Sequence, residues 1–173
     1  MGNLVSKLRK PRKIVVLGLQ NSGKSTIIQL LKHKYMSAKK FPLSPTKGLL
    51  VSAINIQNKA YVLWEVGGYR EIQPFYHCYC IGMSGLIYVM DGKDKLVYEE
   101  SISLLKDIIS NTKSENFVVL VLIHKISQEK EYENIKLELT EILKNKVHNI
   151  FYTNVELEDS VVNAFEWMVD KIK

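Results

Sequence analysis

The first 64 residues of this chain contain no acidic side chain, because Glu65 is the first aspartate or glutamate in the 173-residue sequence. The same 64 residues carry 12 of the 24 lysines and arginines, whereas residues 65–173 combine the other 12 with all 18 acidic side chains. The net charge of +6 therefore hides an N-terminal third that is uniformly basic. Such a segment is expected to bind an anion, and its charge suits nucleic acid, a membrane surface or the phosphates of a nucleotide.

Long apolar runs and cysteine-rich spacing are also lacking. The longest uninterrupted apolar run is residues 117–123, well short of the roughly 20 residues that cross a bilayer as a helix. The two cysteines, Cys78 and Cys80, are two residues apart, a spacing that disfavours a mutual disulfide, and no secretory signal precedes them. We therefore expect a reducing, intracellular compartment and exclude a disulfide scaffold.

The composition is otherwise that of a globular protein, with 46% hydrophobic and 24% charged residues. The length suits a single domain. We expect this domain to span residues 13–173, after a basic N-terminal segment of residues 1–12.

Short apolar runs alternate with segments whose apolar residues recur three and four positions apart. The runs are typical of β-strands and the spaced segments of α-helices, and their alternation predicts a parallel sheet covered on both faces. Two consecutive runs are separated by only residues 57–60, which is too short for a crossover and predicts an antiparallel hairpin at the sheet edge. The six expected strands are residues 14–17, 49–56, 61–66, 86–90, 117–123 and 150–152.

Residues 18–25 read GLQNSGKS and fit the phosphate-binding pattern G-x-x-x-x-G-K-[ST]. The run follows an expected strand and opens an expected helix, which is the context that the pattern requires. Backbone N–H groups of such a loop point at phosphate, the lysine reaches the outer phosphates, and the final hydroxyl ligates Mg²⁺. The expected nucleotide contacts here are Gly18, Asn21, Ser22, Gly23, Lys24, Ser25 and Thr26, with Ser25 on the metal.

The N-terminus begins Met1-Gly2-Asn3-Leu4-Val5-Ser6, which fits the pattern for myristoylation of Gly2. One acyl chain binds membrane only marginally, so the basic residues that follow are the expected second signal toward an anionic leaflet. An unmodified, solubilising basic tail is the alternative interpretation. Nucleic acid is disfavoured as the partner because no aromatic residue interleaves this basic cluster, which consists of Lys7, Arg9, Lys10, Arg12 and Lys13.

Taken with residues 44–48 (SPTKG) and 64–68 (WEVGG), these motifs resemble the ADP-ribosylation factor (Arf) and Arf-like small GTPases from Gly2 to the last helix. The resemblance implies an α/β, P-loop NTPase fold of the small-GTPase type: a six-stranded mixed sheet with one antiparallel edge hairpin and helices on both faces. It also implies GTP or GDP with Mg²⁺ as ligands, with Thr46 on the metal and Gly68 at the γ-phosphate. Leu49, Trp64 and Tyr79 fall where the family presents a surface to effectors, although core packing explains Trp64 and Tyr79 equally well.

The chain departs from the family pattern at several functional positions. Glu65 replaces an aspartate near Mg²⁺, and Tyr69 replaces the glutamine that orients the attacking water, so hydrolysis is expected to be slow. The family sequence N-K-x-D corresponds here to residues 124–127, His-Lys-Ile-Ser. The expected base contacts are therefore His124, Lys125 and Ser127 together with Val155 in the last loop, and recognition of the base is expected to be weakened.

Our first hypothesis is a monomeric Arf-like GTP-binding switch in trafficking or signalling, in the cytoplasm and peripherally on intracellular membranes, that binds effectors and regulators. A second is a pseudo-GTPase adaptor that binds nucleotide weakly or statically. A P-loop ATPase or nucleotide kinase is disfavoured, because a kinase lid needs arginines and this chain has only Arg9, Arg12 and Arg70.

Overall fold

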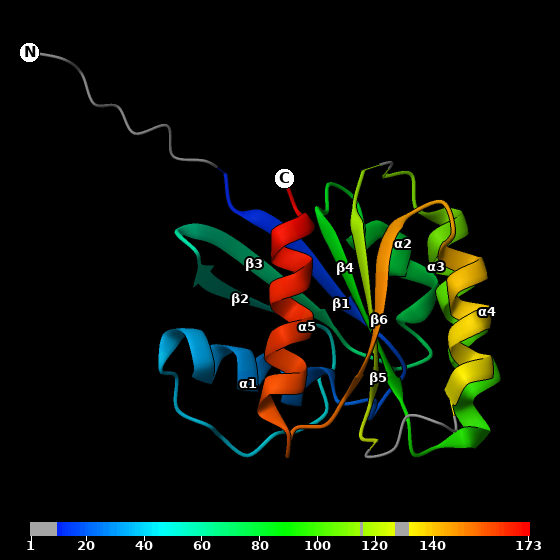
Figure 1. Cartoon of the computed structure of the whole chain (residues 1–173), viewed down its shortest axis with the longest axis horizontal. Helices are drawn as coiled ribbons and strands as arrows, with labels where there is room; N and C mark the ends of the chain where they lie inside the picture. Colours follow the sequence, from blue (N-terminus) through cyan, green and yellow to red (C-terminus); the bar gives the residue numbers. More distant parts are fainter. Residues whose placement is uncertain (1–9, 115, 127–131) are drawn as a thin grey trace, which may run out of the picture.

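A computed structural model describes residues 10–114, 116–126 and 132–173, which form one six-stranded sheet in the order β2-β3-β1-β4-β5-β6 (Figure 1). The pair β2–β3 is antiparallel and lies at one edge, while the other pairs are parallel. The mixed sheet and its edge hairpin are thus confirmed. The strands are β1 (Arg12–Leu17), β2 (Leu49–Ile56), β3 (Lys59–Val66), β4 (Gly85–Asp91), β5 (Val118–His124) and β6 (Val147–Thr153).

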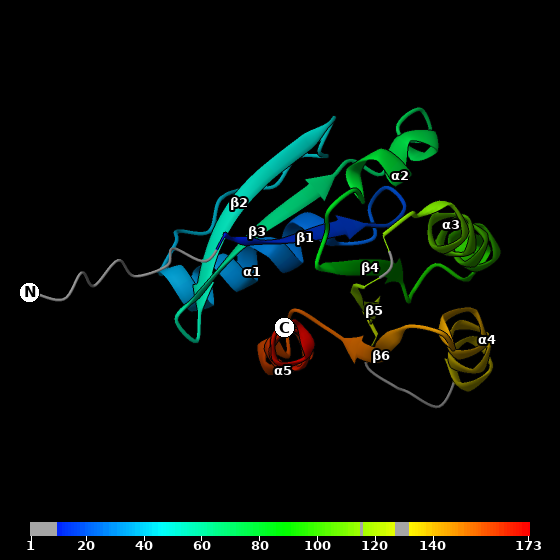
Figure 2. The same cartoon turned by 90° about the horizontal axis from the view of Figure 1, so that it is seen from above.

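Helices cover both faces of the sheet, as expected. In Figure 2, α1 and α5 lie on one side and α2, α3 and α4 on the other. Two short segments, η1 with α2 and η2, were not expected from the sequence because they are too short to show a helical period. The helices are α1 (Lys24–Met36), α2 (Tyr76–Tyr79), α3 (Tyr98–Asn111), α4 (Glu133–Leu143) and α5 (Glu158–Lys171), with 3₁₀ turns η1 (Gln73–Phe75) and η2 (Lys95–Val97).

Each inner strand contributes to two hydrophobic cores. In β1, Ile14 and Val16 pack with α1 and α5, whereas Val15 and Leu17 pack with α3 and α4. Because successive side chains of a strand point to opposite faces, a strand buried on both sides must be apolar throughout. This explains why these strands read as continuous apolar runs in the sequence.

The parallel strands place the connecting loops of interest at one end of the sheet. The chain leaves the carboxyl ends of β1, β4, β5 and β6 at the lower end of the molecule in Figure 1. In open α/β sheets, ligands bind in the crevice outside these carboxyl ends. None of the helices within the described residues is long and apolar enough to cross a membrane.

Candidate functional site

The loop between β1 and α1 folds tightly against neighbouring strands. Gly18 and Gly23 have φ angles of 146° and 103°, which L side chains rarely adopt. A Cβ on Gly18 would lie 2.2 Å from the Val89 carbonyl oxygen, and a Cβ on Gly23 would lie 2.5 Å from Cδ2 of His124. Only glycine fits at these two positions. The loop leads directly into the N-terminus of α1, whose unpaired backbone N–H groups favour an anion.

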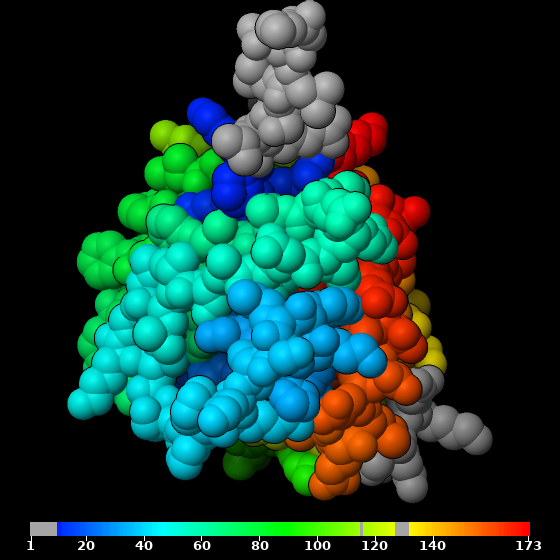
Figure 3. Space-filling view, turned by 90° about the vertical axis from the view of Figure 1, so that its left-hand side faces the viewer, coloured from blue at the N-terminus to red at the C-terminus, as the bar shows by residue number. Residues whose placement is uncertain are grey.

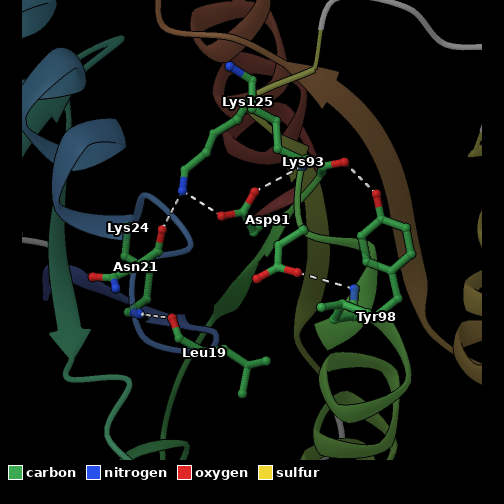
Figure 4. A network of polar contacts seen from close by, with 10 residues as sticks. Leu19, Asn21, Lys24, Asp91, Lys93, Tyr98 and Lys125 are labelled. Carbon is green, nitrogen blue, oxygen red and sulfur yellow. Dashed lines mark hydrogen bonds and ion pairs between the residues drawn. The ribbon is translucent and has the colours of Figure 1, made fainter.

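Lys24 is folded back over this loop. Its Nζ donates hydrogen bonds to the carbonyl oxygens of Gly18 at 3.0 Å and Leu19 at 2.8 Å, as Figure 4 shows for Leu19. The side chain is only 5% exposed. Burial, partly opposed by the charge of Glu65, lowers the pKa of Lys24 to about 8. An anionic ligand would offset the cost of keeping this ammonium charged in a buried position.

A cavity of about 260 Å³ lies beside Lys24 and is lined by residues from four separate segments of the chain. Most of the residues expected from the sequence to contact nucleotide or metal meet here. They are Asn21, Gly23, Lys24, Ser25, Thr26, Thr46, Glu65, Gly68, Tyr69 and Lys125. Gly18 and Ser22 belong to the same loop and are buried beneath its surface.

Three side-chain oxygens converge on one wall of the cavity. Ser25 Oγ and Thr46 Oγ1 both donate to Glu65 Oε1, the second at 2.9 Å, and the two hydroxyls are 3.3 Å apart. The extra methylene of Glu65, compared with aspartate, thus still lets its carboxylate reach both hydroxyls.

This set of oxygen donors fits Mg²⁺, which prefers hard ligands and is usually held by one or two protein carboxylates together with waters and substrate phosphates. Among the described residues no group of three or more histidine, cysteine, aspartate or glutamate side chains could hold a metal by itself. The two hydroxyls and the carboxylate of Ser25, Thr46 and Glu65 suit a metal that also binds phosphate oxygens.

The segment after β3 is pressed against the phosphate-binding loop. A Cβ on Gly68 would lie 2.3 Å from the backbone nitrogen of Gln20, and the Gly67 nitrogen donates to the Gly48 carbonyl at 2.7 Å. Residues 46–48 and 67–68 therefore lie side by side next to the cavity. Tyr69 follows Gly68, is half-buried, and lines the cavity.

Tyr76, which was not singled out from the sequence, connects the segment after β3 to the phosphate-binding loop. Its hydroxyl is the donor in contacts with the Gly67 carbonyl at 2.8 Å and the Gly18 carbonyl at 3.2 Å, and the side chain is 1% exposed. Burial raises the pKa of Tyr76, so the hydroxyl keeps its proton. Because its partners are backbone carbonyls, one of them 58 positions away in the chain, no sequence pattern could have revealed this role.

Replacing Tyr76 by phenylalanine is expected to lower the free energy of unfolding by about 1–2 kcal/mol, because two buried carbonyls lose their shared donor. Urea unfolding followed by circular dichroism should show a lower midpoint with an unchanged slope. Tyr79→Phe is the matched control, since the Tyr79 ring is only half-buried. Equal midpoint shifts in the two variants would contradict a bridging role for the Tyr76 hydroxyl.

Lys125 joins the end of β5 to the phosphate-binding loop. Its Nζ lies 2.5 Å from both the Asn21 carbonyl oxygen and Asp91 Oδ2 (Figure 4). Its backbone is left-handed, with φ of 69°, which is uncommon for lysine. Asp91, the last residue of β4, is thus the partner that holds Lys125 against the loop.

His124 and Val155, expected to contact the base, are not among the residues that line the cavity. His124 is 1% exposed, packs beneath Gly23, and has its Nδ1 3.0 Å from Thr153 Oγ1. Burial, reinforced by the charge of Lys125, lowers the pKa of His124 to about 4, so its ring is neutral at pH 7. Val155 is half-buried against the core near α5. Ser127 and Gly2 lie outside the described residues.

Leu49, Trp64 and Tyr79, the expected effector surface, come together on one side of the sheet. Trp64 and Tyr79 pack against the same core cluster, and the exposed Val51 lies opposite Trp64 in the β2–β3 ladder, on the same face as Leu49. Lys13 Nζ lies 3.8 Å from the centre of the Trp64 ring, a cation–π contact. Each ring is half-buried, so Trp64 and Tyr79 pack against the core with part of each ring exposed, and their contact with effectors stays a prediction.

Comparison with known proteins agrees with this geometry. The model of the ADP-ribosylation factor family matches residues 1–172. The chain is 24% identical over 184 residues to ADP-ribosylation factor-like protein 1 of Caenorhabditis elegans, covering 100% of this chain and 98% of that protein. Its fold is similar to that of the Arl6 BBS3 small GTPase from Trypanosoma brucei, solved with the nucleotide analogue GppNp. The TM-score is 0.79 at 22% identity, covering 92% of this chain and 96% of the other.

Proposed function

The chain belongs to the ADP-ribosylation factor family, and we propose that it binds guanine nucleotide with Mg²⁺ and acts as a nucleotide-dependent switch on membranes. The observation that carries this proposal is the convergence of Ser25, Thr46 and Glu65 beside Lys24 in one cavity. Three segments far apart in the sequence supply these groups. Each group has the chemistry that a metal–phosphate ligand requires.

The residues have separable roles in this proposal. Lys24 and the backbone N–H groups of the loop bind the phosphates, and Ser25 and Thr46 hold Mg²⁺ with Glu65 oriented behind them. Bound Mg²⁺ supplies positive charge that neutralises the phosphate oxygens. Thr46 and Gly68 are on segments that adjoin each other. Contacts of both residues with a third phosphate would therefore couple its presence to the conformation of the effector surface around Leu49, Trp64 and Tyr79.

Hydrolysis by this site is expected to be slow, because a phenol at position 69 cannot both accept and donate as an amide does. The wild-type single-turnover rate is expected at or below about 10⁻⁴ s⁻¹, the order of unassisted small GTPases. Tyr69→Gln should raise that rate several-fold by orienting the attacking water, as measured by phosphate release from preloaded GTP. Unassisted wild-type turnover near about 1 s⁻¹, a rate typical of assisted GTPases, would show that another residue positions the water.

A pseudo-GTPase adaptor is the second candidate, and the buried, neutral His124 favours it. A ring packed beneath Gly23 supports the loop but offers no contact to a base within the cavity. In that case nucleotide would be bound weakly or permanently, and binding partners would recognise the fold rather than its nucleotide state.

The experiment that separates these functions is identification of the nucleotide released when the purified protein is denatured. GDP or GTP in near-stoichiometric amount, exchangeable in the presence of a Mg²⁺ chelator, supports the switch. Guanine nucleotide that does not exchange supports the adaptor. Adenine nucleotide, or none together with no binding of added GTP, would contradict the proposal.

We further propose that membrane association depends on myristoylated Gly2 and on the basic residues after it. An acyl chain and a polybasic segment together give a reversible anchor where either alone is marginal. The protein would then act as a monomer, peripherally attached from the cytoplasmic side of intracellular membranes.

A further inference from the structure

Gln20 is a residue of the phosphate-binding loop whose side chain has no role in the contacts described so far. It is exposed and lines the cavity beside Lys24. Its side-chain amide makes no hydrogen bond among residues 10–114, 116–126 and 132–173. A primary amide carries both a donor and an acceptor. Gln20 therefore brings one of each, without a protein partner, to the edge of the proposed nucleotide site.

Gln20 lies directly against the segment that follows β3. A Cβ on Gly68 would be 2.3 Å from the Gln20 nitrogen. A second hollow, of about 310 Å³, adjoins the cavity, and the described residues that line both are Gln20, Gly68 and Tyr69. These three residues therefore border the opening between the two hollows. The Gln20 amide is thus placed beside Tyr69, whose phenol cannot both accept and donate as an amide does.

The segment between α1 and β2 forms a different wall of the cavity. Residues 43–46 line it, and Figure 3 shows this segment in cyan at the surface, next to the β2–β3 hairpin. Thr46 from this segment donates to Glu65 at 2.9 Å, on the wall proposed to hold Mg²⁺. In phosphoryl transfer the metal bridges the β and γ phosphate oxygens, so that wall is taken when nucleotide is bound. The attacking water is therefore expected at the opening between Gln20 and Tyr69.

Two other amides lie close to the site, and each is placed less well to contact this water. Gln73 Nε2 donates to the Gly68 carbonyl at 3.1 Å, and Gln73 lines only the second hollow. Asn21 lines the cavity but is next to Lys125, whose Nζ contacts the Asn21 carbonyl oxygen. Gln20 is therefore the amide that is both unengaged and next to Gly68.

We propose that Gln20 is a catalytic residue for GTP hydrolysis, whose amide orients the attacking water in place of the residue at position 69. The inference rests on the proposed binding of GTP. Gln20 Oε1 accepts a hydrogen bond from the water, and Nε2 donates to an oxygen of the γ-phosphate.

The reaction itself leaves the amide unchanged. The water oxygen bonds to the γ-phosphorus, the bond from this phosphorus to the β–γ bridging oxygen breaks, and a water proton passes to the released phosphate. The products are GDP and inorganic phosphate. An amide at this point is compatible with slow turnover, because small GTPases without an assisting partner hydrolyse GTP at a rate on the order of 10⁻⁴ s⁻¹.

The test follows conversion of bound GTP to GDP in the full-length, preloaded protein, by chromatography of the nucleotide released on denaturation. Gln20→Leu keeps the size of the side chain and removes the amide. It should lower the rate about tenfold, the equivalent of one lost orienting hydrogen bond, while the affinity for a fluorescent GTP analogue changes little. Gln57→Leu makes the same change at an exposed position in the β2–β3 turn and should keep the wild-type rate.

A double-mutant cycle separates catalysis from support of the loop. In the Tyr69→Gln background a second amide is available to the water, so Gln20→Leu should lower the rate by less than about twofold there. Such coupling is expected of two groups that can perform one task.

A further measurement does not depend on turnover. In ¹⁵N-labelled protein, the side-chain NH₂ signals of Gln20 are those missing from Gln20→Leu. They should shift when GDP is exchanged for a non-hydrolysable GTP analogue, because only the triphosphate places oxygens beside this amide. The NH₂ signals of Gln57 should not move.

Several outcomes would overturn the inference. An unchanged rate in Gln20→Leu would remove the amide from the reaction, and a faster rate in Gln20→Ala would mean that the side chain obstructs the water. Equal losses in the two backgrounds would reduce Gln20 to a support of the loop. A loss in Gln73→Leu alone would assign the water to that neighbouring amide.

Failure of the proposed function is distinguishable from failure of this inference. If the proposed function fails, the wild type binds no guanine nucleotide at all. If the protein binds GTP with Mg²⁺ and the bound GTP persists without conversion to GDP, only the catalytic role of Gln20 is contradicted.

Discussion

Replacing Lys24 by methionine is expected to weaken the binding of GDP and GTP by about a hundredfold, while the protein remains folded. A charge-assisted hydrogen bond contributes about 1.5–3 kcal/mol, and Lys24 is placed to make such bonds to phosphate oxygens. Methionine keeps the length and apolar stem of the side chain, so the buried volume beside Gly18 and Leu19 is preserved. Titration with fluorescent GDP and GTP analogues in the presence of Mg²⁺ gives the affinities.

Lys93→Met is the matched control, because Lys93 is exposed at the same end of the sheet but does not line the cavity. Its affinity for nucleotide should be close to that of wild type. A Lys24→Met variant that keeps wild-type affinity would contradict the assignment of the cavity as the phosphate site.

The same lysine predicts the pH dependence of binding. In the free protein, burial lowers the pKa of Lys24 to about 8, and bound phosphates would raise it again because they favour the charged form. Below pH 8 the ammonium is charged in both states, so affinity is independent of this group. Above pH 8 the free protein must take up a proton to bind, and affinity should fall with rising pH. Lys24→Met should lack that additional fall, which the same titrations measure.

Replacing Ser127 by aspartate is expected to tighten GTP and GDP binding by roughly one to two orders of magnitude. The family aspartate accepts two hydrogen bonds from guanine as a charged group, whereas serine makes at most a neutral one. Although Ser127 itself lies outside the described residues, Lys125 and Ile126 just before it are anchored. Lys125 contacts Asn21, and the Ile126 side chain packs where a Cβ on Gly92 would lie, 2.1 Å from its Cγ2.

ATP binding should be unchanged or weaker in Ser127→Asp, because adenine lacks the matching pair of donors. Ser127→Asn is the control that adds a side chain of similar size without the charge, and its gain should be smaller. The measurement is a parallel titration with fluorescent GTP, GDP and ATP analogues. Discrimination of about a thousandfold against ATP by the wild type, equivalent to about 4 kcal/mol, would contradict weakened recognition of the base.

Much of the fold follows from local signals. The alternation of β-branched runs and amphipathic segments predicted every strand, and residues 57–60 predicted the edge hairpin because four residues cannot cross over a sheet. The phosphate-binding loop could also be recognised in the sequence, because its glycines, lysine and serine lie within one short run of residues. The short helices between residues 73 and 97 were not predicted, because one turn carries no period.

The supports of the site depend on contacts between distant residues. Tyr76 and Gly18 are 58 positions apart, and Lys125 and Asp91 are 34 positions apart. His124 shows the same limit of prediction from sequence. Family resemblance placed it with the base contacts, but its ring is packed beneath Gly23, where shape and burial decide its role.

The sequence by itself determined the α/β alternation, the edge hairpin, the phosphate-binding loop and the basic character of the first 64 residues. These properties reside in neighbouring residues, whose spacing sets secondary structure and whose charge is independent of folding. Only the tertiary structure decided that Glu65 accepts hydrogen bonds from both Ser25 and Thr46, and that Tyr76 joins the phosphate-binding loop to the segment after β3. It also decided that Gln20 lies beside Gly68 and Tyr69 at the edge of the cavity. Such arrangements arise from how the sheet orders its strands, because strand order brings together residues that no sequence interval relates.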